Sequence, residues 1–305
     1  MLSFLLFLLA LHVQSQGHKC PSFKYPSFKC PSLLQKSSNL ARHGGPGGPG
    51  GPGGPGVIHQ TWKRHELDSK SRAWFNSWTA KNPSCQHKLW NDTEVEALVR
   101  SKSAQLIWPI WDGLLPVERA DAFRYLVLWA YGGYYADIDV ACLVPISEMA
   151  FPKETDMIVG YETGHHLTEA ERRGARFSRT DQFEQWFFAS SPSNPVLLRC
   201  LELIREKFAW RIESTLELTG PATFTDAVHE FLEKDSPEAL SNLIAGHTGR
   251  SSRFSKRLFP SESLYRRGNL TMWVLASQRV SSPGYSSDDD PGTPIVQHHF
   301  SGTWK

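Results

Sequence analysis

The chain has little of several features that mark common protein classes. It has five cysteines in 305 residues, and their spacing matches no zinc site. Its long apolar run, Leu2 to Val13, is about a dozen residues, whereas a membrane-spanning helix needs about twenty. It has no clustered basic helix. The first 56 residues hold five of the 33 basic residues and none of the 31 acidic ones, so the rest is mildly acidic and no nucleic-acid partner is expected.

The N-terminal segment predicts entry into the secretory pathway. The short apolar run fits the hydrophobic region of a signal peptide, and Val13-Gln-Ser15 is a plausible cleavage pattern. A short uncleaved anchor over residues 1–16 is the alternative, and it would be the only membrane association. Residues 17–56 contain Cys20-Pro-Ser-Phe repeats and Gly-Gly-Pro units, which predict a flexible stalk. One large domain is expected over 57–305.

The body alternates strand-like and helix-like segments. This alternation predicts an α/β fold with a mixed, mainly parallel sheet. The expected strands lie at 57–62, 87–90 and 157–161, and the expected helices at 70–80, 93–101, 116–131, 195–208 and 223–232.

A pair of acids follows the best-defined helix. Gly132-Gly133 should end that helix, and an extended segment should then carry Asp137 and Asp139 on one face with Ile138 in the core. Two adjacent carboxylates repel unless a cation lies beside them. Hard divalent ions such as Mn²⁺ or Mg²⁺ take oxygen ligands and keep positions open for substrate phosphates, so the pair predicts a metal–diphosphate site.

The sequence around the acids resembles glycosyltransferase family 32, with its DXD sugar-binding region. Within that family it is most similar to the Golgi initiation-specific α-1,6-mannosyltransferases. The resemblance covers roughly 57–305. It rests on five motifs in order: Ile58-His-Gln-Thr-Trp62, Asp121-x-x-Arg124 to Asp139, Phe183-x-x-Trp186 to Pro195, Thr219-Gly-Pro221, and His298-His-Phe-Ser-Gly-Thr-Trp304. It implies a GT-A fold, a single Rossmann-like catalytic domain.

The resemblance implies roles for four charged residues. Asp139 would bind the metal, and Asp137 would contact ribose, sugar or metal-bound water. Arg124 would reach the donor sugar or phosphates, and Asp121 would hold sugar hydroxyls. An ordinary surface ion pair is the alternative for Asp121 and Arg124, which are three residues apart on a helix.

Further donor and metal contacts are expected at both ends of the domain, from Thr61, Trp62, His299, Thr303 and Trp304. Thr61 and Trp62 would meet the nucleotide base, although a strand tryptophan is often a core residue. His299 is preferred over His298 as a metal ligand. Thr303 and Trp304 would cap the phosphates.

The function expected from the resemblance is metal-dependent, retaining transfer of a hexose. The expected donor is GDP-mannose, and the expected acceptor is an N-glycan or another mannoside in the Golgi lumen. UDP-galactose or UDP-N-acetylglucosamine as donor, and an inactive secreted carbohydrate-binding protein, stay open as alternatives. A phosphohydrolase that uses Asp-x-Asp would need a nearby hydroxyl, but Val140-Ala-Cys142 follows the pair.

Overall fold

A computed structural model describes residues 56–103, 105–152, 154–162, 177–179, 182–233, 263–275, 279–281 and 294–302. The expected signal or anchor at 1–16 and nearly all of the expected stalk at 17–56 lie outside these ranges, as do Thr303 and Trp304.

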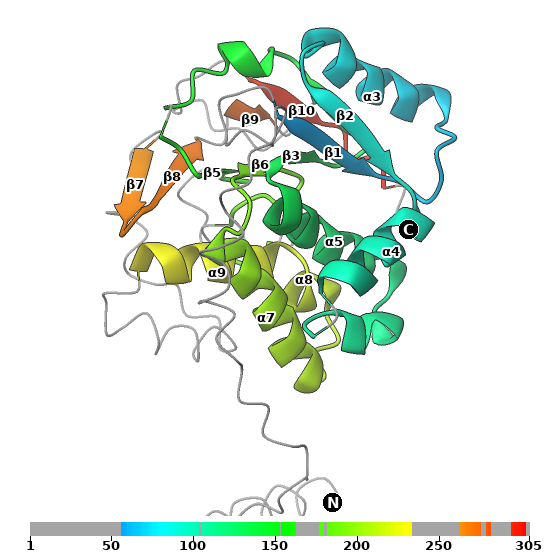
Figure 1. Ribbon diagram of the computed structural model, residues 1–305, viewed down its shortest axis with the longest axis vertical. Helices are drawn as coiled ribbons and strands as arrows, with labels where there is room; N and C mark the ends of the chain where they lie inside the picture. Colours follow the sequence, from blue (N-terminus) through cyan, green and yellow to red (C-terminus); the bar gives the residue numbers. More distant parts are fainter. Residues whose placement is uncertain are drawn as a thin grey trace, which may run out of the picture. The chain divides into compact units, whose positions relative to one another are not determined.

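The centre of the described region is a seven-stranded sheet with the order β2-β1-β3-β6-β5-β8-β7 (Figure 1). Strands β2, β1, β3, β5 and β8 run one way, and β6 and β7 run the other way. This confirms the expected mixed, mainly parallel α/β sheet. The strands are β1 (Val57–Thr61), β2 (Gln86–Trp90), β3 (Gly133–Ala136), β5 (Met157–Gly160), β6 (Phe187–Ser190), β7 (Ser263–Arg267) and β8 (Leu270–Leu275).

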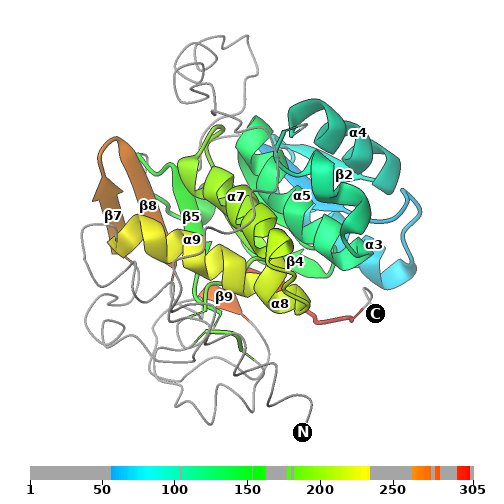
Figure 2. The ribbon, with the colours of Figure 1, turned by 90° about the horizontal axis from the view of Figure 1, so that it is seen from below.

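Helices cover one face of this sheet, as Figure 2 shows for α5, α7 and α9. The helices are α3 (Ser69–Lys81), α4 (Asp92–Lys102), α5 (Pro116–Tyr131), α7 (Pro195–Ala209), α8 (Thr215–Leu218) and α9 (Pro221–Glu233). Two short 3-10 helices, η1 (Trp108–Gly113) and η2 (Ile146–Glu148), complete the helical segments of the described residues. The helical face buries Tyr135 and Phe188 from the strands against Phe123 and Leu201 from the helices.

The opposite face carries α3 and a small second sheet of β4 (Val140–Cys142), β9 (Val280–Ser281) and β10 (Val296–His298), in the order β4-β10-β9. Alternate strand residues, such as Tyr134 and Phe187, point to this side and pack with Trp78 and Val296. The pleat therefore separates two cores. In the small sheet, β10 pairs with β4.

The helix ends follow local chemistry. Asn91 caps α4: its side chain accepts from the backbone N–H of Glu94, whose carboxylate accepts from the N–H of Asn91. Gly132 at φ 66° and Gly133 at φ 96° end α5 as expected.

Two further observations concern the described residues. None of the described helices has the length and apolar character to cross a membrane. Cys85, Cys142 and Cys200 are unbridged thiols.

Candidate functional site

The sheet reverses its chain order between β1 and β3. From β1 the chain passes through α3 to β2 on one side and returns later through α5 to β3 on the other. Ligands of open α/β sheets bind beyond the carboxyl ends of strands at such a switch point. Asp137 is the first residue after β3, so the acids lie at this edge.

The acids sit in a turn and not in a strand. The expected strand carrying both of them is wrong, because β3 ends at Ala136 and the backbone N–H of Val140 bonds the Asp137 carbonyl at 3.0 Å. Ile138 is buried, as expected. The turn, rather than strand alternation, brings the two carboxylates to the same place.

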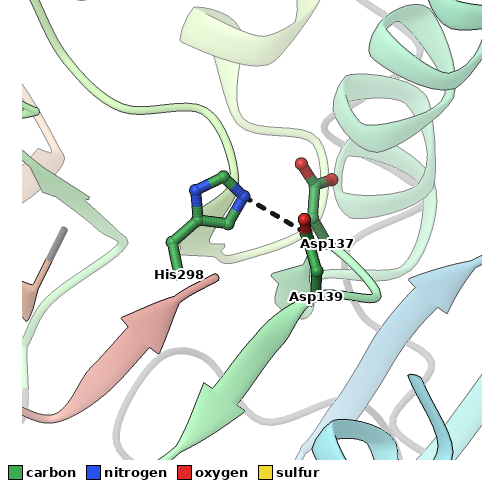
Figure 3. A group of neighbouring side chains, drawn as sticks. All are labelled: Asp137, Asp139 and His298. Carbon is green, nitrogen blue, oxygen red and sulfur yellow. Dashed lines mark hydrogen bonds and ion pairs between the residues drawn. The ribbon is translucent and has the colours of Figure 1, made fainter. Parts of the chain in front are cut away.

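Asp139 is a buried carboxylate with several donors around it, and Figure 3 shows its contact with His298. Its Oδ1 lies 3.2 Å from His298 Nε2, and its Oδ2 accepts from the backbone N–H and the hydroxyl of Ser301, both at 2.9 Å. Burial raises the pKa of Asp139. The hydrogen bonds from His298 and Ser301 and the charge of His298 outweigh this effect and lower the pKa to about 2. Asp139 is therefore ionised at any pH where the protein would act.

Asp137 and Arg124 form a second polar contact at the edge. The Nη2 of Arg124 lies 3.1 Å from Asp137 Oδ1, which also accepts the Tyr135 hydroxyl at 2.8 Å. The Asp137 side chain is a quarter exposed, so it faces the open edge, while Arg124 is buried. Burial raises the pKa of Asp137, and the Arg124 charge opposes that rise.

Asp121 lies behind Arg124 and holds it. Its Oδ1 is 3.1 Å from Arg124 Nη2 and accepts from Gln185 Nε2 at 3.2 Å, and its Oδ2 accepts the Thr219 hydroxyl at 2.8 Å. The pair is buried, so the alternative of a surface ion pair is wrong. Burial raises the pKa of Asp121 to about 6 against the opposing Arg124 charge.

The two C-terminal histidines point to different places. His298 comes from β10, stacks on Trp186 with ring centroids 4.8 Å apart, and faces Asp139. The His299 ring instead stacks on Trp74 at 4.8 Å, and its backbone N–H donates to the Asp139 carbonyl. The structure thus places His298, and not the preferred His299, beside the acids, because β10 pairs with β4 directly after Asp139.

Three side chains at this edge fit a divalent cation. One ligand atom each from Asp137, Asp139 and His298 lie within 4.8 Å of one another. Two carboxylate oxygens and one imidazole nitrogen suit Mn²⁺ or Mg²⁺ better than a soft thiolate-binding metal. The donor set therefore fits the metal that the sequence predicts.

The expected base-binding residues lie on the neighbouring strand. Thr61 ends β1, and its hydroxyl donates to the Trp90 carbonyl at 3.2 Å. Trp62 follows it, half-buried, with the Lys63 ammonium 5.2 Å from its ring centroid. Both residues are at the carboxyl end of β1, on the same edge as the acids.

Several residues of the site were not predicted. Ser301 lies in a motif that the sequence singles out, but its contact with Asp139 depends on the fold. Gln185, which bonds Asp121, and Tyr135, which bonds Asp137, carried no separate signal. Gln185 lies inside Phe183-x-x-Trp186, so that motif marks the segment that reaches the site.

A protein-family model matches part of this chain. The family model described as "Glycosyltransferase sugar-binding region containing DXD motif" matches residues 68–160. This confirms the resemblance drawn from the motifs.

Two fungal proteins resemble most of the chain. The "Initiation-specific alpha-1,6-mannosyltransferase" of Schizosaccharomyces pombe is 31% identical over 275 residues, which are 82% of this chain and 63% of that protein. The protein of the same name in Candida albicans is 27% identical over 81% of this chain and 71% of its own length. This chain thus spans somewhat less than two thirds of the first relative.

Two further similarities cover less of this chain. "Inositol phosphoceramide mannosyltransferase 3" of Schizosaccharomyces pombe is 33% identical over 40% of this chain and 37% of its own length. The solved structure "PaToxG Glycosyltransferase" has 18% identity and a TM-score of 0.45, covering 68% of this chain and 83% of that one.

Proposed function

Because residues 68–160 belong to the family of the glycosyltransferase sugar-binding region containing the DXD motif, we propose that this protein is a glycosyltransferase that moves mannose from GDP-mannose onto a glycan acceptor. The observation that carries the proposal is the group of Asp137, Asp139 and His298 at the carboxyl edge of the sheet. The mannose assignment is supported by the names of the relatives, most of which are mannosyltransferases.

The donor diphosphate needs positive charge as it leaves. Asp139, Asp137 and His298 would hold Mn²⁺ or Mg²⁺, which when bound acts as a Lewis acid on phosphate oxygens. Arg124 adds a fixed cation: within the described residues its Nε–H has no partner, which leaves a donor for a phosphate oxygen or a sugar hydroxyl. Asp121 keeps that guanidinium in place, and its remaining lone pairs would accept a sugar hydroxyl.

The transfer step needs no separate protein base. The bond from the sugar C1 to the diphosphate oxygen breaks, a bond from C1 to the acceptor oxygen forms, and the acceptor proton passes to the departing diphosphate. This route keeps the α configuration, as the family resemblance implies. Thr61, Trp62, Thr303 and Trp304 are the proposed contacts to base and phosphates.

The setting of the reaction is part of the proposal. The apolar N-terminus supports delivery to the secretory pathway, with the Golgi lumen as the working compartment, and membrane association through that segment if it is uncleaved. No nucleic-acid partner is proposed, since the sequence after residue 56 is mildly acidic and has no clustered basic helix.

The donor is tested by direct comparison. The full chain is incubated with Mn²⁺ and a mannoside acceptor, in parallel with GDP-mannose, UDP-galactose and UDP-N-acetylglucosamine, and the released nucleoside diphosphate is measured. We expect release from GDP-mannose above the other two. Turnover of a UDP-sugar alone would refute the mannosyl assignment, and no turnover together with binding to glycans would favour the carbohydrate-binding alternative.

The metal role is tested with Asp139→Asn. The amide keeps the size of the side chain but removes the charge, so we expect the melting temperature to stay within a few degrees while kcat/KM falls by about a hundredfold or more. Asp112→Asn, at an exposed acid, is the matched control. Wild-type activity in Asp139→Asn would remove Asp139 from the metal site.

A further inference from the structure

Gln60 is a fully buried polar side chain next to the acid pair. It lies on β1 and has no exposed surface. It belongs to the motif Ile58-His-Gln-Thr-Trp62, but the proposed function gives Gln60 no role. Its Nε2 donates to the Asp137 carbonyl at 2.9 Å, and its Oε1 lies 2.9 Å from His87 Nε2. Both ends of the amide are therefore bonded.

The contact to Asp137 replaces a missing part of the sheet. Strands β1 and β3 pair only at Ile58↔Tyr134 and His59↔Tyr135, so the next position has no backbone ladder between them. The Gln60 side chain reaches across this gap. The Asp137 N–H donates to the Trp186 carbonyl at 2.8 Å on the other side, so Asp137 is fixed from both neighbouring strands.

The orientation of the Gln60 amide is determined by its partners. A backbone carbonyl can only accept, so the NH₂ group must face Asp137 and the amide oxygen must face His87. His87 Nε2 then donates, and its Nδ1 accepts from the Thr79 hydroxyl at 2.8 Å. Burial lowers the pKa of His87 to about 4, in keeping with this neutral ring, and Phe75 stacks on it at 3.9 Å.

A line of hydrogen bonds thus runs from α3 through β2 and β1 to the acid turn. Neither Thr79 nor His87 bonds an acid of the site among the described residues. Thr79 orients His87, and His87 orients the Gln60 amide. A free amide would rotate and release the Asp137 carbonyl. The peptide between Asp137 and Ile138 would then turn, and both carboxylates with it, since the turn contains all three residues.

We propose that Gln60 is a positioning residue, which holds the Asp137–Asp139 turn in the geometry that binds a divalent cation and the donor diphosphate. The inference rests on the proposed function. It adds a specific role: Gln60 touches neither metal nor sugar and acts through the backbone of Asp137.

The test compares three variants with the wild-type full chain. Gln60→Met keeps the buried volume and loses both hydrogen bonds. His87→Leu leaves Gln60 without the donor that orients it. Gln86→Met, at an exposed position of β2, is the control. Mn²⁺ binding in the presence of GDP is measured by electron paramagnetic resonance, and kcat, KM for GDP-mannose and melting temperature are measured in parallel.

We expect Gln60→Met to bind Mn²⁺ at least tenfold more weakly and to lose between about tenfold and a hundredfold in kcat/KM, while remaining folded. His87→Leu should change both in the same direction by less, and Gln86→Met should change neither. If Gln60→Met does not fold, the Mn²⁺ affinity and kcat/KM of His87→Leu decide whether Gln60 positions the turn.

Wild-type Mn²⁺ affinity and kcat/KM in the folded variants would overturn the inference and give Gln60 a purely structural role. That result differs from failure of the proposed function, in which the wild-type chain itself turns over no nucleotide sugar. If the wild type binds Mn²⁺ without turnover, the resonance measurement still decides the role of Gln60.

Discussion

The carboxylates of the site differ in pKa because their neighbours differ. The pKa of Asp139 is about 2, because hydrogen bonds from His298 and Ser301 outweigh burial, whereas burial lifts the pKa of Asp121 to about 6 despite Arg124. Asp139 is thus the acid most suited to a cation, and Asp121 is suited to hold Arg124. The same residue type serves two purposes through its surroundings.

Residue-scale electrostatics also predicts a pH dependence through His59. Its Nδ1 accepts from Trp90 Nε1 at 3.1 Å, so its Nε2 carries the proton and donates to the Gly132 carbonyl. Burial lowers its pKa to about 4 from 6.5. Between these two values the unfolded chain binds more protons than the folded chain. The free energy of unfolding should therefore decrease as the pH drops from 7 to 5, by about 2 kcal/mol from this group.

Urea unfolding between pH 7 and pH 5 checks this. His59→Gln removes the titrating ring and should flatten the fall in the free energy of unfolding, whereas His65→Gln, at an exposed histidine, should not. Equal slopes in wild type and His59→Gln would contradict a buried neutral His59.

The sequence predicted those site residues that lie in one continuous motif. Asp121, Arg124, Asp137 and Asp139 fall within nineteen residues whose helix, glycine stop and acid pair are locally encoded. The choice between His298 and His299 was not predictable, because it depends on the register of β10 against β4. Gln60 was missed for a related reason, since its partner is 77 residues away.

At the scale of elements, the passage from α5 to β3 depends on glycine. A Cβ on Gly133 would lie 2.3 Å from the Val57 carbonyl oxygen, and φ is 96°. The close approach lets β1 and β3 pair directly after the helix ends. Any side chain there would push the two strands apart at the switch point.

Gly133→Ala should therefore destabilise the fold by about 3 kcal/mol or more, combining backbone strain with a clash against fixed backbone. Gly268→Ala is the control, because φ is 55° there but nothing lies within 4 Å of an added Cβ, so it should cost only about 1 kcal/mol. Chemical denaturation measures both. Equal losses would show that the approach to Val57 relaxes easily.

The elements that sequence predicted best are those with strong local period and clear stops. The helices α3, α5 and α7 and the strands β1, β2 and β5 agree with expectation to within one or two residues. Strands β6, β7 and β8 were not predicted. Phe187–Ser190 is a short apolar run with no alternation, and β8 pairs with β5 across more than a hundred residues, which local pattern does not encode.

At the scale of the whole molecule, charge and composition divide the chain near residue 56. The first 56 residues carry basic but no acidic side chains, with repeated Gly and Pro. A segment this rich in Gly and Pro cannot bury enough apolar surface to offset its ordering entropy, so we expect the domain to fold without it.

We accordingly expect a chain that begins at Gly56 to keep the melting temperature and the kcat/KM of the full chain. A chain that begins at Lys63 removes β1, which lies between β2 and β3 and carries Gln60, so it should not fold. Circular dichroism and nucleotide release measure the two outcomes. Loss of folding in the longer chain would show that the segment before Gly56 packs on the domain, while folding of the shorter chain would mean that the sheet tolerates loss of the strand at its switch point.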